Sequence, residues 1–245
     1  MAVLRRSSLL LAGVLAVVCG RASAQQDGGG GSLSPALPTL WVVGNEAASL
    51  GQGLQALFDP AKIHVVDRSE AGGGERSMLE NGSWARTLEM VRPGDVVLID
   101  FERGPGATES LPGVSDEMRI VPGQAGSSGQ EILRTYGWYL RRYAIDVIAH
   151  GATPVLCAFA AADTAAPGAE EAWVKAIAAQ QRIAYVDGAA AVRAMQGRPA
   201  ATAIVAGLKG LKDDPLSGYF SADGDAVPAY RLPEPTGAPA TAPPL

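Results

Sequence analysis

Short apolar segments alternate along this chain with longer amphipathic ones, and this alternation constrains the fold more than any other feature. Five of the short segments have the composition of β-strands: Leu40–Val43, Ile63–Val66, Val96–Asp100, Pro154–Phe159 and Ile183–Val186. Their residues are apolar on both faces of the strand, which is typical of a parallel sheet covered by helices on either side. The sequence therefore predicts an α/β fold, a three-layer α/β/α sandwich with a mainly parallel sheet of about five strands.

The amphipathic segments between these strands are predicted to be helices. They are Gly51–Phe58, Trp84–Val91, Gln130–His150 and Ala169–Gln181. In the third, apolar residues recur at spacings of three and four, which places them on one helix face. Ligands of open parallel sheets bind beyond the carboxyl ends of the strands. We therefore expect functional residues directly after each strand, with residues 219–229 as a late loop that reaches the same edge.

The two ends of the chain are predicted to lie outside the folded domain. A pair of arginines, a short apolar run and a small-residue cleavage site make residues 1–24 typical of an export signal peptide. Residues 25–37 form a Gly/Ser-rich lead, residues 38–231 one domain, and residues 232–245 a Pro/Ala-rich tail. We expect a secreted or periplasmic protein without membrane association after cleavage. The alternatives are an uncleaved anchor or a lipid anchor at Cys19.

Composition argues against several classes of function. The net charge of -5 and the lack of a long basic run argue against nucleic-acid binding. Of the two cysteines, Cys19 lies in the signal segment, so we expect no disulfide within the mature chain. Cys157 is predicted to be a small buried apolar residue. No spacing of His, Cys or Asp indicates a metal site, and we expect no cofactor.

Longer stretches of the sequence show a resemblance to a known family. The stretch "EILRTYGWYLRRYAIDVIAHGATPVL" is the longest, and "GGGERSMLENGSW" and "MVRPGDVVLIDF" precede it. Their order and spacing resemble the SGNH (GDSL-type) hydrolases, and more narrowly the bacterial rhamnogalacturonan acetylesterases. The resemblance covers nearly the whole predicted domain. It implies the SGNH-hydrolase fold and an esterase site in which a serine attacks, a histidine takes the proton and an aspartate orients the histidine.

The resemblance also implies that the attacking group and part of the oxyanion hole have been replaced. Where the family has Gly-Asp-Ser, this chain has Gly44, Asn45 and Glu46, so Glu46 stands at the nucleophile position. The asparagine that stabilises the oxyanion in the family is matched by Gly104. The glycine that contributes an amide to the same oxyanion is matched by Gly72.

The histidine of the implied triad is replaced as well. The family's Asp-x-x-His block is matched by Asp223, which is retained, and by Ala226, which stands at the histidine position. The chain has two histidines, and both His64 and His150 are predicted to be structural or surface residues. Ser49 has no identifiable base. Loss of several triad members predicts that esterase chemistry is lost.

Three functions remain open from the sequence. The first is an inactive pseudoenzyme, either a mere scaffold or one whose cleft binds a saccharide or cell-envelope glycan. The expected cleft residues are Glu46, Arg76, Trp84, Glu102, Arg103 and Asp223. The second is an active carbohydrate acetylesterase with a rearranged site. The third is a glycan hydrolase in which carboxylates provide the general acid and the base. The carboxylates considered for that role are Glu46, Glu102, Asp223 and Asp225.

Overall fold

The computed structural model of the chain describes residues 36–45, 49–102, 109–123, 129–159, 169–195 and 198–232. All of them belong to the unit that begins at Ala36. No helix within these ranges is both long enough and apolar enough to cross a membrane.

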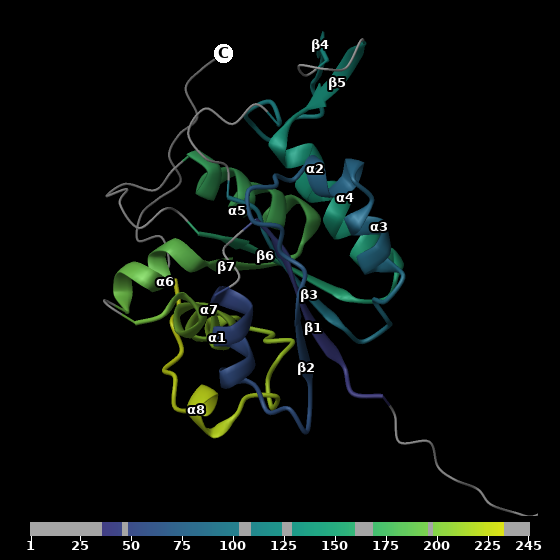
Figure 1. Ribbon diagram of the computed structural model, residues 1–245. Helices are drawn as coiled ribbons and strands as arrows, with labels where there is room; N and C mark the ends of the chain where they lie inside the picture. Colours follow the sequence, from purple (N-terminus) through teal and green to yellow (C-terminus); the bar gives the residue numbers. More distant parts are fainter. Residues whose placement is uncertain are drawn as a thin grey trace, which may run out of the picture. The chain divides into compact units, whose positions relative to one another are not determined.

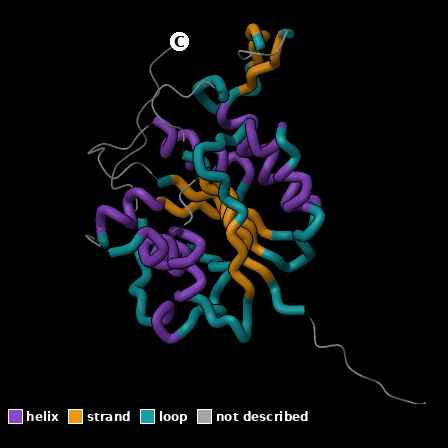
Figure 2. The backbone as a smooth tube through the Cα atoms, viewed as in Figure 1, coloured by secondary structure: helices purple, strands orange, loops and turns teal. Residues whose placement is uncertain are grey.

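A parallel sheet of five strands forms the middle layer (Figures 1 and 2). The strands lie in the order β2 (His64–Asp67), β1 (Thr39–Gly44), β3 (Val96–Asp100), β6 (Thr153–Ala158) and β7 (Ala184–Asp187). Numbered along the chain, this is the order 2-1-3-4-5 of flavodoxin-like folds. The predicted fold class is confirmed, and the bounds of each strand lie within one residue of those predicted.

Helices cover both faces of the sheet, as Figure 1 shows. One face carries α1 (Ser49–Leu57), α6 (Gly188–Ala194), α7 (Ala200–Gly210) and α8 (Ala222–Asp225). The other carries α2 (Ser77–Glu80), α3 (Ser83–Leu88), α4 (Tyr136–Ala149) and α5 (Ala169–Gln181).

The central strands supply side chains to both layers. In β1, Leu40 and Val42 face the α1 side, whereas Trp41 and Val43 face the α4 side. This alternation explains why the strand is apolar throughout, because successive side chains of a strand point to opposite faces.

The helix predicted over Gln130–His150 begins later than expected. Its first five residues form β5 (Gln130–Arg134), which pairs antiparallel with β4 (Met118–Pro122) in a separate two-stranded sheet. Thr135 then starts α4, because its extended backbone lets Oγ1 accept a hydrogen bond from the Trp138 amide at 3.1 Å. The apolar spacing from Leu133 to Tyr136 suits a helix, but this N-cap sets the boundary between them.

Asp95, which directly precedes β3, links the beginning of β3 to the beginning of β1. Its carboxylate accepts hydrogen bonds from the Thr39 amide at 2.8 Å, the Trp41 indole at 2.9 Å and the Arg92 amide at 2.9 Å. The residue is 4% exposed, so these donors would be left without water if the carboxylate were absent. This contact fixes the amino-terminal edge of the sheet, opposite the edge expected to bind ligands.

Candidate functional site

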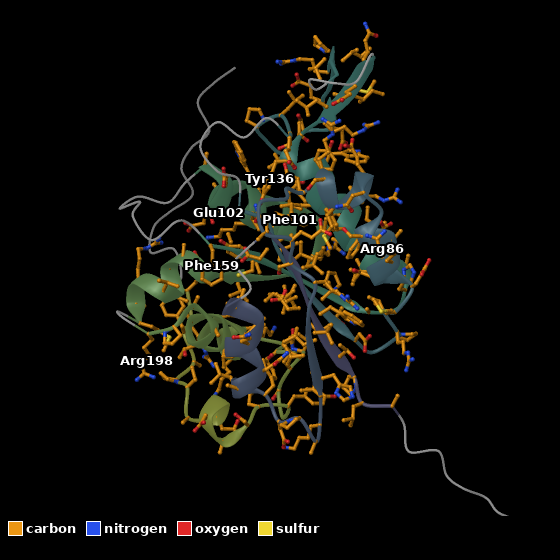
Figure 3. All side chains as sticks on the ribbon, in the orientation of Figure 1. Arg86, Phe101, Glu102, Tyr136, Phe159 and Arg198 are labelled. Atoms are coloured by element: carbon orange, nitrogen blue, oxygen red, sulfur yellow. The ribbon has the colours of Figure 1, made fainter. Side chains whose placement is uncertain are left out.

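The carboxyl ends of the five parallel strands lie along one edge of the sheet, which we call the rim. Figure 3 labels Glu102, which follows β3, and Phe159, which follows β6, at this edge. The rim also includes Asn45 after β1, the segment 67–73 at the end of β2 and Asp187 at the end of β7. Glu46, Arg103 and Gly104 were expected here and lie outside the described residues.

Asn45 joins the ends of β1 and β3. Its side-chain Nδ2 donates to the Glu102 carbonyl at 2.6 Å, and its Oδ1 accepts from the Glu102 amide at 2.7 Å. The Asn45 amide also donates to the Asp100 carbonyl at 3.3 Å. Both ends of the side-chain amide are therefore engaged with backbone. Asn45 holds the rim together, and its side chain is not turned toward a ligand.

Gly44 is required by the same close approach of β1 and β3. A Cβ atom placed on Gly44 would lie 1.7 Å from the carbonyl oxygen of Asp100, which no side chain tolerates. The glycine of "VVGNEAAS" therefore has a structural reason that does not depend on catalysis.

The segment after β2 folds back along β1. The Arg68 amide donates to the Val42 carbonyl at 2.8 Å, and the Glu70 amide to the Gly44 carbonyl at 2.9 Å. Gly72, matched to an oxyanion-hole glycine, follows in a left-handed conformation with φ of 76°. The prediction that this segment belongs to the rim agrees with these contacts, whereas nothing in them tests an oxyanion role for Gly72.

Two of the expected cleft residues are engaged within the fold. Arg76 is 6% exposed, and its guanidinium forms ion pairs at 2.6 Å with both Glu80 and Glu131. Burial alone would lower the pKa of Arg76, but the hydrogen bonds and charges of these two carboxylates outweigh burial and raise the pKa above its ordinary value. Arg76 is therefore a structural cation, and the expectation that it lines a ligand cleft is corrected.

Trp84 is a core residue. It is 2% exposed, its ring packs edge-on against Tyr143 with ring centroids 4.7 Å apart, and its indole donates to Asp146 at 3.0 Å. A sugar ring cannot stack on an indole that is already covered on this side by the protein core. The expectation that Trp84 lines a ligand cleft is therefore corrected.

Asp223 and Ala226 lie at the opposite edge of the sheet from Asn45. Asp223 belongs to α8, and the residue that caps α8, Ser221, bonds through its amide to the Leu57 carbonyl at 3.0 Å. Leu57 ends α1, a helix of nine residues that starts at the rim and spans about 13 Å. Figure 1 shows α8 beyond this far end of α1. The prediction that residues 219–229 form a loop at the rim is therefore wrong. Packing against α1 holds this segment at the opposite edge of the sheet.

This placement also separates the carboxylates considered for glycan hydrolysis. Asp223 and Asp225 lie on α8, whereas Glu102 follows β3 at the rim. An acid and a base must flank the same bond, so Glu102 cannot act together with Asp223 or Asp225. Glu46 lies outside the described residues.

Neither histidine of the chain lies at the rim. His64 is the first residue of β2 and pairs with Thr39, the first residue of β1. His150 caps the carboxyl end of α4, directly before β6 begins. Both positions are at the amino-terminal edge of the sheet, as structural or surface histidines would be. Because the sequence contains two histidines in all, no imidazole is available to a nucleophile at the rim.

A cavity of about 600 Å³ lies beside the rim, between the end of β2 and α3. It is lined by Asp67, Arg68, Ser69, Glu70, Met78, Ser83, Arg86, Thr87, Glu89 and Met90. Figure 3 labels Arg86 on the outer side of α3. Within the described ranges neither Arg68 nor Arg86 forms an ion pair, whereas Oε2 of Glu70 accepts a hydrogen bond from the side-chain Nδ2 of Asn81 at 2.8 Å. The cavity therefore offers two guanidinium groups, the exposed carboxylate of Glu89, the half-buried carboxylates of Asp67 and Glu70, and apolar methionine surface.

The sequence indicated only part of this cavity. Residues 67–70 follow a predicted strand and were expected at the rim for that reason. Arg86, Glu89 and Met90 come from and just beyond α3, and only tertiary packing brings them beside β2. The part of the chain that the structure describes contains no group of three or more side chains suited to a metal ion. Cys157 is buried in β6, as predicted.

No protein-family model and no curated protein sequence matches the chain. Among solved structures, protein YxiM from Bacillus subtilis aligns with a TM-score of 0.48 and 17% sequence identity. The alignment covers 65% of this chain but only 46% of the YxiM chain. A catalytic mutant of Axe2, an acetylxylan esterase from Geobacillus stearothermophilus, aligns with a TM-score of 0.43 and 15% identity, covering 64% of this chain and 79% of that one. Likeness at this level carries no conclusion about substrate or activity.

Proposed function

We propose that the protein is a non-catalytic relative of carbohydrate esterases that binds a saccharide beside the rim and does not hydrolyse esters through a Ser-His-Asp triad. One observation carries the loss of catalysis: both histidines lie at the edge of the sheet opposite the rim. A serine hydroxyl is a weak nucleophile at neutral pH and needs an adjacent base. Without an imidazole at the rim, the family's route is closed whichever serine is considered.

The cavity beside α3 supports saccharide binding. Sugar hydroxyls donate to carboxylates and accept from guanidinium groups, and the apolar face of a sugar ring packs on carbon surface. Arg86 and Glu89 supply the polar groups of one side, Arg68 those of the other, and Met90 supplies apolar surface. The sequence blocks resemble those of rhamnogalacturonan acetylesterases, so pectic saccharides and cell-envelope glycans are the first ligands to test.

Calorimetric titration with neutral and acidic oligosaccharides tests this binding. We expect saturable binding that Arg86→Ala weakens at least several-fold, because the guanidinium would contact the ligand directly. Arg119→Ala is the matched control, since Arg119 is 64% exposed on β4 and does not line the cavity. If the two variants bind every oligosaccharide as the parent does, the cavity is not the saccharide site.

Export is a separate proposal. The arginine pair, apolar run and small-residue site near the N-terminus support signal cleavage after residue 24 and a secreted or periplasmic location. Mass spectrometry of the protein recovered outside the cytoplasm should give Gln25 as the first residue. Recovery of the uncleaved chain in the cytoplasm alone would contradict it.

A further inference from the structure

Asn81 lies in the turn between α2 and α3 and contacts three residues of the cavity beside α3 without lining the cavity itself. Its side-chain Nδ2 donates to Oε2 of Glu70 at 2.8 Å, and its Oδ1 accepts from the Ser83 amide at 2.8 Å. Its backbone carbonyl accepts from Nη1 of Arg86 at 3.3 Å. Asn81 therefore connects the segment after β2 with α3, the two sides of the cavity.

The backbone around these contacts is also held in place. The Asn81 amide donates to the Ser77 carbonyl at 2.9 Å, and the Glu70 amide is bonded to the end of β1. Gly82 follows Asn81 with φ of 76°, a conformation that favours glycine. A Cβ atom on Gly82 would lie 3.3 Å from Nη1 of Arg86, so the glycine also leaves room for the guanidinium. The turn thus fixes where the Arg86 side chain lies.

The contacts of Asn81 leave Glu70 and Arg86 unpaired with each other. Both side chains line the cavity, yet no ion pair joins them in the described part of the chain. Asn81 gives one oxygen of Glu70 a neutral donor and gives Arg86 a neutral acceptor, so neither contact cancels a charge. A carboxylate and a guanidinium each have further hydrogen-bonding capacity. The cavity therefore keeps an acceptor and a donor as separate groups.

We propose that Asn81 is a positioning residue of the cavity, and that Glu70 and Arg86 bind neighbouring hydroxyl groups of one neutral sugar ring. This inference rests on the saccharide binding proposed above. One hydroxyl donates to the carboxylate and the next accepts from the guanidinium, so an adjacent pair of hydroxyls uses both groups at once. An ion pair between Glu70 and Arg86 would remove this arrangement, and Asn81 prevents it by bonding to each of them.

The charges of the cavity favour a neutral sugar over an acidic one. Asp67, Glu70 and Glu89 supply three carboxylates, whereas Arg68 and Arg86 supply two guanidinium groups. A uronate would add its own negative charge to a cavity in which carboxylates already outnumber cations, and like charges repel. We therefore expect a neutral ring to bind more tightly than a uronate with the same ring hydroxyls.

Calorimetric titration with tetragalacturonate and with its carboxyl-reduced form tests the ligand class. The two tetramers share their linkage and ring hydroxyls and differ in the carboxylate or hydroxymethyl group of each ring. We expect the neutral tetramer to bind about threefold more tightly or better at low salt, with a smaller difference at high salt. Tighter binding of the acidic tetramer would overturn this inference and leave saccharide binding standing. Binding of neither tetramer would overturn both proposals.

Asn81→Asp tests the positioning role. It removes the Nδ2 donor and sets a carboxylate against Glu70, but it keeps an acceptor for the Ser83 amide. We expect affinity for the neutral tetramer, measured below the unfolding transition, to fall about two- to tenfold. Adding Glu70→Gln exchanges donor and acceptor and should recover part of the loss, which a purely structural role would not produce. Gln55→Glu, the same change at an exposed amide outside the cavity, should bind as the parent does.

A measurement without ligand tests the hydrogen bond itself. In NMR spectra, the side-chain amide protons of Asn81 should exchange with water faster in Glu70→Ala than in the parent. Glu89→Ala removes a carboxylate of the same cavity that makes no hydrogen bond within the described residues, so exchange should not change. Equal exchange in the three proteins would overturn the positioning role of Asn81. Losses of affinity from Asn81→Asp and Glu70→Gln that simply add in the double variant would overturn it as well.

Discussion

Asn45 and Glu102 hold each other through two hydrogen bonds that use both ends of the asparagine side-chain amide, at 2.6 Å and 2.7 Å. The two residues are 57 positions apart in sequence and follow neighbouring parallel strands. The sequence resemblance predicted that Asn45 matches the residue before the nucleophile of an acetylesterase. In the structure, its side chain closes the rim between β1 and β3 instead.

Substitution of Asn45 tests this structural role. Asn45→Asp removes the Nδ2 donor and places a carboxylate oxygen against the Glu102 carbonyl, so we expect the free energy of unfolding to fall by about 1–3 kcal/mol. Gln55→Glu is the matched control, because Gln55 Nε2 also donates to a backbone carbonyl, that of Val65 at 3.2 Å, but at an exposed site. Urea denaturation should show a change within about 0.5 kcal/mol for the control. Equal effects of the two substitutions would contradict the role given to Asn45.

Asp95→Ala should destabilise the opposite edge of the sheet more strongly. Three donors lose their shared acceptor in a site that is 4% exposed, so we expect a loss of about 3 kcal/mol or more in the free energy of unfolding. Asp59→Ala removes a half-buried carboxylate near the surface that accepts a hydrogen bond from the Ala61 amide, and its effect should stay within about 1 kcal/mol. Denaturation curves that rank the two in the reverse order would show that Asp95 does not fasten β1 to β3.

Trp84→Phe separates the core role of Trp84 from a ligand platform. The phenyl ring is smaller and lacks the donor to Asp146, so we expect a loss of about 1–3 kcal/mol in stability. Saccharide affinity measured below the unfolding transition should stay unchanged, in contrast to Arg86→Ala. Loss of saccharide affinity in a folded Trp84→Phe protein would show that Trp84 contributes to the binding site.

Restoring the family's residues by sequence position should fail to restore activity. In the combined variant Asn45→Asp, Glu46→Ser, Gly104→Asn and Ala226→His, the new histidine lies near the far end of α1 and cannot reach a nucleophile at the rim. We expect no hydrolysis of a nitrophenyl acetate above that of the parent. Turnover by this variant that the three-substitution variant without Ala226→His lacks would contradict the placement of α8.

The sheet could be predicted because its signal is local. The central strands β1, β3 and β6 are buried on both faces and are apolar over almost their whole length, which makes them recognisable in the sequence. The hairpin β4–β5 was missed because β5 continues the apolar spacing of α4, and only the cap at Thr135 separates them. The sequence also could not show that α8 packs on α1, since Ser221 and Leu57 meet only in the folded chain.

The site residues were predicted less well, because their surroundings are formed by residues that lie far apart in the sequence. Positions directly after a strand, such as Asn45 and Glu102, are found by counting along the sequence. Whether a side chain there faces a ligand or the backbone depends on neighbours far away in the chain. Arg76 looked available in sequence, but Glu131 of the hairpin neutralises it.

The release of acetate from acetylated saccharides by the purified parent protein tests the central claim most directly. Because the rim has no histidine, we predict that release at pH 5–8, followed with an acetylated pectic oligosaccharide and with nitrophenyl acetate, equals that of a sample without protein. Steady turnover that remains with the protein through purification and disappears in Ser49→Ala would contradict the account, since it would place a working serine nucleophile at the start of α1.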